Sequence, residues 1–291
     1  MSQATLTLPV ADAFEPTTPR RLPDGVTAVS CLWLIVAVAA CVLVPLVLQV
    51  NADTTNVAQS YAPPSGAHWL GTDGLGRDEL ARLLVGGRIT LAVGAVAAIV
   101  AMLIGTMYGA LAGYYGGWLD TALMRVVDVL LSVPTLFLLL FLAAMFHGNV
   151  LALMLVIGAT SWLQPARLVR GEMLTLKERV YVEAARAVGA GDRRIIFAHL
   201  VPNAAGTVIT TTTFMIASAM LAETALSYLG IGVRAPTPSW GNLLSSAQSD
   251  LFAQAYWLIL PPGLAILATV CALNFLGDAL RDRGEGAGAL R

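Results

Sequence analysis

Lysine is almost absent from the sequence, and charged residues of every kind are scarce. Lys177 is the single lysine in 291 residues, and Leu176 precedes it. A phosphate-binding P-loop needs a glycine directly before its lysine, so ATP cannot bind this chain through such a loop. Charged residues make up 12% of the chain, against about 25% in an average soluble domain. The net charge of −1 offers no basic surface for nucleic acid, which we do not expect as a partner.

Cysteine and histidine are also rare, and neither follows a pattern typical of a metal site. They are Cys31, Cys41, Cys271, His68, His147 and His199. No Gly-x-Ser-x-Gly motif marks a nucleophilic serine. The stretch "GTDGLGRDEL" at 71–80 lacks the spacing of a calcium loop or a dinucleotide loop, and we expect Asp73 or Asp78 to cap a short helix there. We therefore expect no catalytic residue, no metal and no cofactor on this chain, which would not be an enzyme.

Apolar residues, in contrast, make up 57% of the sequence. A membrane-spanning helix needs about 20 apolar residues. The sequence therefore predicts an all-α polytopic membrane protein with six transmembrane helices, at about 27–50, 89–112, 125–146, 150–166, 204–232 and 256–277. The proline-rich residues 1–25 predict a disordered tail. Residues 26–282 then form one membrane domain, followed by a C-terminal tail at 283–291.

The distribution of basic residues predicts the orientation of the chain. With the N-terminus in the cytoplasm, the inner segments hold 13 lysine and arginine residues and the outer segments hold 4. Basic residues favour the cytoplasmic side of a membrane, so we expect both termini there (N-in, C-in). Residues 167–203 then form a cytoplasmic loop, and residues 51–88 and 233–255 form outer loops.

The cytoplasmic loop has a two-part helical pattern. In "YVEAARAVGA", a semi-apolar stripe runs along one helical face, formed by Val180, Ala184, Ala187 and Val188. The glycines in "GAG" at 189–191 end this helix, and we expect Asp192 to cap the next one. The second helix places Ile195, Ile196, His199 and Leu200 on one face. The pattern fits either an amphipathic helix lying on anionic lipid or a docking surface for a cytoplasmic partner.

The same segment resembles the EAA loop of ABC-importer permeases. That loop reads Glu-Ala-Ala, three residues, Gly, nine residues, then Ile-x-Leu-Pro, and the matching residues here are Glu183, Ala184, Ala185, Gly189 and Pro202. The sequence departs from the pattern at His199 and Val201. Further stretches resemble the peptide/nickel branch, including "HWLGTDGLGRDELARLL" (68–84), "LAGYYGGWLDTALMRVVD" (111–128) and "PTPSWGNLL" (236–244). Over about residues 68–282 the chain is similar to the C-type permease subunit of a di-/oligopeptide importer.

This resemblance implies a function and a set of partners. The loop would be a coupling helix seated in a groove of an ATPase, and ATP and Mg would bind the ATPase chains. The expected partners are a second, B-type permease, two ATP-binding subunits, an extracytoplasmic substrate-binding protein and membrane lipid, with the assembly in the cytoplasmic membrane. Peptides are the expected substrate, and nickel or another small solute is the alternative. A stand-alone secondary transporter is less favoured, because of the EAA loop and because the sequence shows no inverted pair of spans broken by glycine or proline.

One further candidate lies within the fifth span. Glu223, in "AMLAETALSYLG", costs about 2.5–3.5 kcal/mol as a lone carboxylate at membrane depth. It should therefore face a translocation path or the interface with a partner permease, or else bond to another helix of the same chain. Near the second span, small residues at spacings close to four predict close helix packing, namely Gly94, Ala98, Gly105, Gly109 and Gly113.

Overall fold

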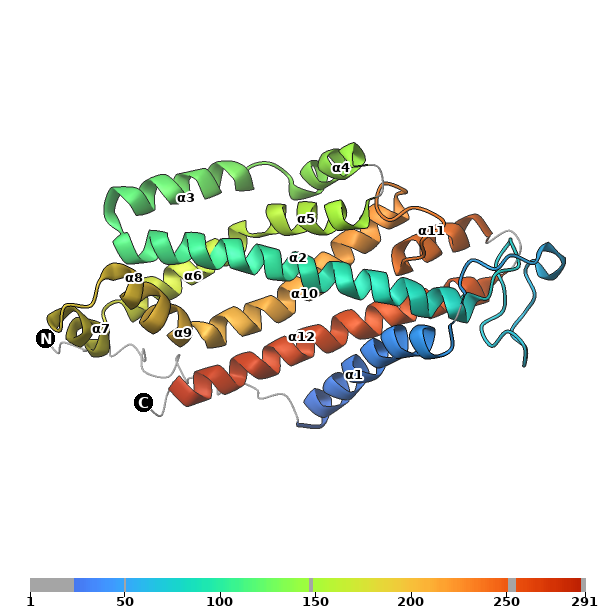
Figure 1. Ribbon diagram of the computed structural model, residues 1–291, viewed down its shortest axis with the longest axis horizontal. Coiled ribbons are helices and arrows are strands. Elements are labelled where there is room, and N and C mark those ends of the chain that lie inside the picture. Colours follow the sequence, from blue (N-terminus) through green and yellow to red (C-terminus); the bar gives the residue numbers. More distant parts are fainter. Residues whose placement is uncertain (1–23, 50, 147–148, 251–254, 289–291) are drawn as a thin grey trace, which may run out of the picture.

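The computed structural model describes residues 24–49, 51–146, 149–250 and 255–288, all of which are helical or lie in connecting segments. The predicted tail at 1–25 falls outside the described residues except for residues 24 and 25. The helices lie side by side along the longest axis of the molecule (Figure 1). We call its two ends the α7 end, on the left of Figure 1, and the α11 end, on the right.

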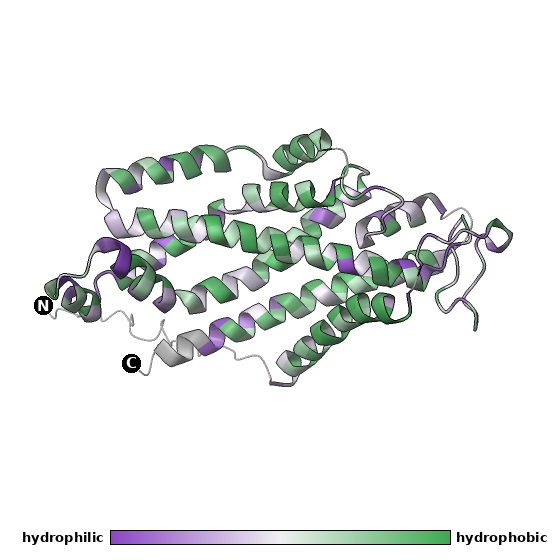
Figure 2. Cartoon of the chain, viewed as in Figure 1, coloured by the Kyte–Doolittle hydropathy of each residue, from purple (hydrophilic) through white to green (hydrophobic). Residues whose placement is uncertain are grey.

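Four helices in the described part of the chain are long and apolar enough to cross a membrane. They are α1 (Asp24–Val47), α2 (Glu79–Tyr115), α10 (Ala205–Tyr228) and α12 (Leu260–Gly288). Figure 2 shows hydrophobic residues along most of their length. Helix α2 extends the predicted span 89–112 at both ends, and α12 continues past the predicted boundary at residue 282.

The third and fourth predicted spans are each a bent pair of helices. Helices α3 (Gly117–Leu131) and α4 (Thr135–Met145) meet at 79°, and α5 (Val150–Ser161) and α6 (Leu163–Leu176) meet at 44°. The chain has six candidate spans if each pair crosses once. The expectation that the chain lacks an inverted pair of broken spans stays a prediction, because these bends do not show how the two pairs are related to each other.

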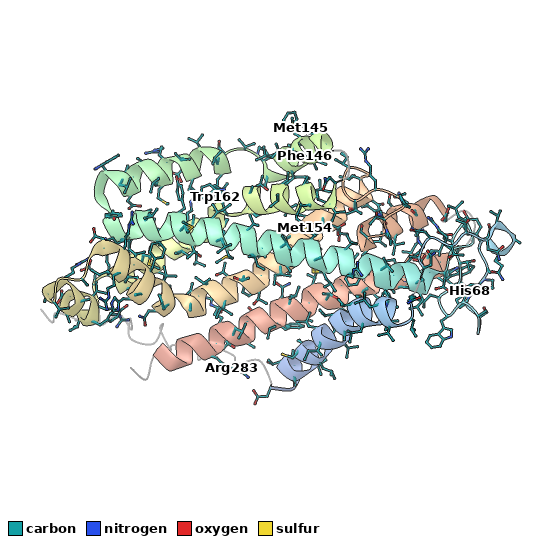
Figure 3. The ribbon with its side chains drawn as sticks, in the orientation of Figure 1. His68, Met145, Phe146, Met154, Trp162 and Arg283 are labelled. Carbon is teal, nitrogen blue, oxygen red and sulfur yellow. The ribbon has the colours of Figure 1, made fainter. Side chains whose placement is uncertain are left out.

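Two prolines account for these bends. Pro134 precedes α4, and Pro165 lies in the first turn of α6. Proline lacks the N–H that would bond to the carbonyl four residues earlier, and its ring clashes with that carbonyl. Trp162 lies at the second bend (Figure 3), where its ring centroid is 4.7 Å from that of Tyr108 on α2.

Helix α2 packs closely against α6 through its glycines. A methyl group placed on Gly109 would lie 2.4 Å from the carbonyl oxygen of Ala166, and one on Gly105 would lie 2.6 Å from Cβ of Pro165. Only a residue without a side chain permits this approach. The close packing predicted from the small residues of this span is therefore confirmed at both glycines.

The α11 end is built from the 51–78 segment, with η1 (Val57–Gln59), together with α11 (Trp240–Ser249) and η4 (Tyr256–Leu258). Asp78 caps α2, because its side chain accepts a hydrogen bond from the Ala81 N–H at 2.8 Å. The predicted cap is confirmed, although it begins a long helix instead of a short one. The Tyr61 hydroxyl donates to Asp250 at 2.7 Å, and this carboxylate raises the pKa of Tyr61 above its ordinary value.

His68 also belongs to the α11 end (Figure 3). Its Nδ1 lies 2.7 Å from the Asp78 carboxylate, and its Nε2 lies 3.2 Å from Gln59. The 51–78 segment is thus attached to the Asp78 cap of α2 through His68, and to Asp250 at the end of α11 through Tyr61.

Candidate functional site: the helix-turn-helix loop

The loop between α6 and α10 has the predicted helix-turn-helix form. It contains α7 (Val180–Ala187), α8 (Asp192–Arg194), a π-helical turn η2 (Ile195–Leu200) and α9 (Val201–Asn203). Together these elements form the α7 end of the molecule (Figure 1).

Gly189 ends α7 in the way its sequence position predicts. Its φ is +83°, a conformation that glycine adopts without steric cost. The Gly189 N–H donates to the Arg186 carbonyl at 2.9 Å, and the Ala190 N–H donates to the Ala185 carbonyl at 3.0 Å. These two bonds form a Schellman motif, which satisfies carbonyls left free at a helix end. The turn therefore requires a left-handed residue at position 189.

The prediction that Asp192 caps the second helix is wrong. The N-cap residue is Gly191, and no side chain caps this helix. The Asp192 carboxylate instead accepts a hydrogen bond from the Tyr114 hydroxyl at 2.7 Å. Tyr114 is the penultimate residue of α2, and its hydroxyl joins that helix to the loop.

The loop has a buried face and an exposed face. Val182, Ile195 and Leu200 are completely buried, in a cluster with residues of α2 and α6. Ile195, Ile196 and Leu200, which were predicted to share one face, are all buried, and His199 is half-buried. The other stripe faces outward, and Val180 and Val188 are 79% and 84% exposed. An exposed apolar stripe on a polar loop offers a surface for contact with another molecule.

The structure places the predicted loop residues on or near this exposed surface. Ala185 is half-buried, and the others are exposed, namely Glu183, Ala184, Gly189, Asp192 and Pro202. The hydropathy colouring marks hydrophilic residues around the same loop (Figure 2). The arrangement can present a short helix and a rigid turn to a partner.

Several contacts that attach the loop were missed by the sequence reasoning. Lys177 Nζ donates to the Gly113 carbonyl at 3.1 Å. Arg170 on α6 binds Asp120 on α3 with two hydrogen bonds, of 2.5 and 2.6 Å. These partners lie 50 or more residues apart in the sequence, so no local periodicity could have paired them.

Glu223 lies away from this loop, toward the α11 end. Its side chain is 0% exposed and accepts hydrogen bonds from the Thr90 hydroxyl on α2 at 2.9 Å and from the Ser227 hydroxyl at 2.6 Å. Both hydroxyls also accept bonds, Thr90 from the Trp240 N–H and Ser227 from the Val233 N–H. The carboxylate therefore joins α2, α10 and the start of α11. The bond to Thr90 agrees with one of the expectations, that Glu223 bonds to another helix of the same chain. A role in a translocation path or in the interface with a partner permease stays a prediction.

Comparison with known proteins identifies the family. A family model described as the inner membrane component of binding-protein-dependent transport systems matches residues 105–284, which include the whole loop and Glu223. The chain belongs to this family.

Curated relatives agree over most of the chain. It is 37% identical to the oligopeptide transport system permease protein OppC of Bacillus subtilis over 254 residues, covering 87% of this chain and 83% of the relative. It is 35% identical to the dipeptide transport system permease protein DppC of the same organism over 264 residues, covering 90% and 82%. It is 42% identical to the glutathione transport system permease protein GsiD of Pectobacterium atrosepticum over 219 residues, covering 75% and 72%.

The family fixes the general role of the chain. It is a non-catalytic transmembrane permease component of the inner membrane. A binding-protein-dependent system implies a substrate-binding protein and ATPase partners. Within the described residues, no group of three or more His, Cys, Asp or Glu side chains is placed to hold a metal ion.

Proposed function

We propose that this chain is the C-type permease subunit of an ATP-driven importer that carries peptides across the cytoplasmic membrane. The observation that carries the proposal is the likeness, over most of the chain, to permeases named for oligopeptides, dipeptides and glutathione. These substrates share amide-linked amino acids, so a peptide backbone is the common chemistry. Nickel or another small solute remains the alternative. Uptake of labelled dipeptide, longer peptide, glutathione and nickel by the complete importer distinguishes them; uptake of nickel alone would contradict a peptide substrate.

The proposed importer contains a second, B-type permease, two ATP-binding subunits that hold ATP and Mg, and an extracytoplasmic binding protein. Six spans with both termini in the cytoplasm place the α7 end on the ATPase side. Reporter fusions at residues 190 and 288 are expected to report cytoplasm, and fusions at 60 and 245 the outside. A cytoplasmic signal at residue 245 would contradict this topology.

The helix-turn-helix loop is proposed to dock into a groove of the ATPase. Support comes from the exposed stripe that contains Val180 and Val188, and from the rigid turn at Gly189 beside exposed Glu183. Gly189→Val places a β-branched residue at a positive φ, which strains the turn. Glu183→Lys reverses a charge on the docking surface. Both variants should insert normally and weaken ATPase binding or ATP-driven uptake by about tenfold, the effect of a 1.4 kcal/mol change.

Gly191→Val is the matched control for the turn. Gly191 also has open space around it, but its φ is −71°, which valine adopts readily. The measurements are capture of the ATPase subunits by the tagged permease and peptide uptake in reconstituted vesicles. Normal binding and uptake in both Gly189→Val and Glu183→Lys would contradict the docking role. The alternative, an amphipathic helix lying on the lipid surface, would then be favoured.

The bend between α3 and α4 supports a second permease as neighbour. Val133 and Pro134 interrupt the helix inside an apolar stretch. Non-helical backbone at membrane depth is tolerated against protein or water, but not against lipid. We assign this face to the interface between the permeases. In the assembled importer, a fluorophore at Val133 should be protected from lipid-borne quencher, whereas one at exposed Ile35 on α1 should not. Equal quenching would contradict the assignment.

A further inference from the structure

The last turn of α2 is attached to both parts of the helix-turn-helix loop. We call α7 the first arm and the segment from α8 to α9 the second arm. Tyr114 donates its hydroxyl hydrogen bond to Asp192 of the second arm at 2.7 Å. The guanidinium carbon of Arg186, on the first arm, lies 5.6 Å from the centroid of the Tyr114 ring. A single side chain of α2 therefore contacts a cation from one arm and an anion from the other.

Burial makes these contacts specific. Tyr114 is only 8% exposed, and it belongs to the same apolar cluster as Val182 of the first arm and Ile195 of the second. A buried tyrosine needs a partner for its hydroxyl while its ring fills apolar space. Here the ring packs with both arms and the hydroxyl fixes one of them. The contact of Arg186 with the ring face adds a cation–π attraction.

We infer that Tyr114 is the positioning residue that sets the angle of the helix-turn-helix loop relative to α2. From this residue α2 runs without a break to its cap at Asp78. A displacement of the loop by the ATPase is therefore passed to α2 through the Tyr114 contacts and reaches the α11 end along one helix. This inference rests on the docking role proposed above.

Variants of the Tyr114–Asp192 pair test the inference in the complete reconstituted importer. Tyr114→Phe keeps the ring and its contact with Arg186, and removes only the hydroxyl. Asp192→Leu removes the acceptor, whereas Asp192→Asn retains an acceptor oxygen. We expect Tyr114→Phe and Asp192→Leu each to lower the peptide taken up per ATP hydrolysed by about three- to tenfold, as for loss of a typical intramolecular hydrogen bond. Asp192→Asn should remain close to wild type. The double variant Tyr114→Phe with Asp192→Leu should be no worse than either single variant, because both remove the same bond.

A purely structural role in the apolar cluster gives a different result. Phenylalanine would then replace tyrosine without effect on the uptake ratio, and Asp192→Leu would also be neutral; this outcome overturns the inference. Additive losses in the double variant would overturn it as well, since the two residues would then act separately. Tyr115→Phe is the matched control, because Tyr115 is 50% exposed and Phe keeps the ring that packs edge-on against that of Tyr114.

The same experiment separates this inference from the proposed function. If the wild-type chain fails to capture the ATPase subunits or to support ATP-driven uptake, the proposed function fails. If the wild type passes both tests while Tyr114→Phe and Asp192→Leu equal it, only the positioning role of Tyr114 fails.

Discussion

Helix α2 is one unbroken helix, whereas each of the pairs α3–α4 and α5–α6 is divided by a bend. Helix α2 has 37 residues without a proline, a length of about 55 Å at 1.5 Å per residue. The α3–α4 and α5–α6 pairs turn by 79° and 44°. An unbroken helix moves as one body, whereas a proline-containing break lets its two halves change their angle. We therefore expect α2 to carry displacement between the ends of the molecule and the bent pairs to accommodate it.

The largest effect is expected from Gly109→Val on α2. A Cβ atom at this position would lie 2.4 Å from the Ala166 carbonyl oxygen and 2.9 Å from the backbone nitrogen of Arg170. Backbone atoms cannot rotate away as a side chain can, so α2 and α6 must separate. We expect the free energy of unfolding to fall by about 3 kcal/mol, as for overpacking of a core, measured by thermal unfolding of the purified complex in detergent.

The matched control is Gly171→Val on α6, where a Cβ meets nothing within 4 Å. This variant should change the stability by less than about 0.5 kcal/mol, as for other surface substitutions. If both variants are equally stable, close packing does not hold α2 in place, and the contrast with the bent pairs loses its basis.

A smaller effect is expected from Glu223, which ties α2 to α10 near the α11 end. Glu223→Leu leaves the buried hydroxyls of Thr90 and Ser227 without their acceptor, at a cost of about 2 kcal/mol. Glu223→Gln keeps one acceptor oxygen and should be more stable than Glu223→Leu. Uptake and thermal stability, measured together, distinguish the two roles of this residue. Altered uptake by Glu223→Gln at wild-type stability would favour the translocation path, whereas wild-type uptake would favour a structural bond.

The smallest effect on stability is expected from Pro134→Ala, at or below about 1 kcal/mol. Alanine restores the N–H that can bond to the Leu130 carbonyl, so the angle between α3 and α4 should open toward a straight helix. Spin labels at the exposed Trp118 and Phe141 positions, in a chain with its cysteines replaced, should move apart. Val133→Ala with the same labels keeps the proline and should leave the distance unchanged. An unchanged distance in Pro134→Ala would mean that packing, and not Pro134, maintains the bend.

Features that depend on residues close together in the sequence could be predicted. Apolar runs placed the long helices within a few residues of α1 and α10, although α2 is longer than its apolar run because Asp78 begins it outside that run. The spacing of apolar residues in the loop placed Ile195, Ile196 and Leu200 on one face, and Gly189 was recognised from its place after a helical stretch.

Features that depend on distant residues were missed. Hydropathy averages over a window, so Pro134 and Pro165 did not reveal the bent pairs even though proline is known to bend helices. Asp192 has the sequence position of a cap, but a tyrosine 78 residues away takes its carboxylate. The position of Glu223 within an apolar run was evident from the sequence, whereas its partner Thr90 on α2, 133 residues away, could be known only from the packing of the helices.

The bond between Lys177 and the Gly113 carbonyl has a practical consequence for labelling. Because the sequence contains one lysine, an amine-selective reagent can modify only one side chain of this subunit. That amine donates a hydrogen bond to the Gly113 carbonyl, and we expect its acylation to become faster when the loop leaves the end of α2. The unmodified subunit thus carries its own chemical reporter at the point where the loop joins the membrane domain.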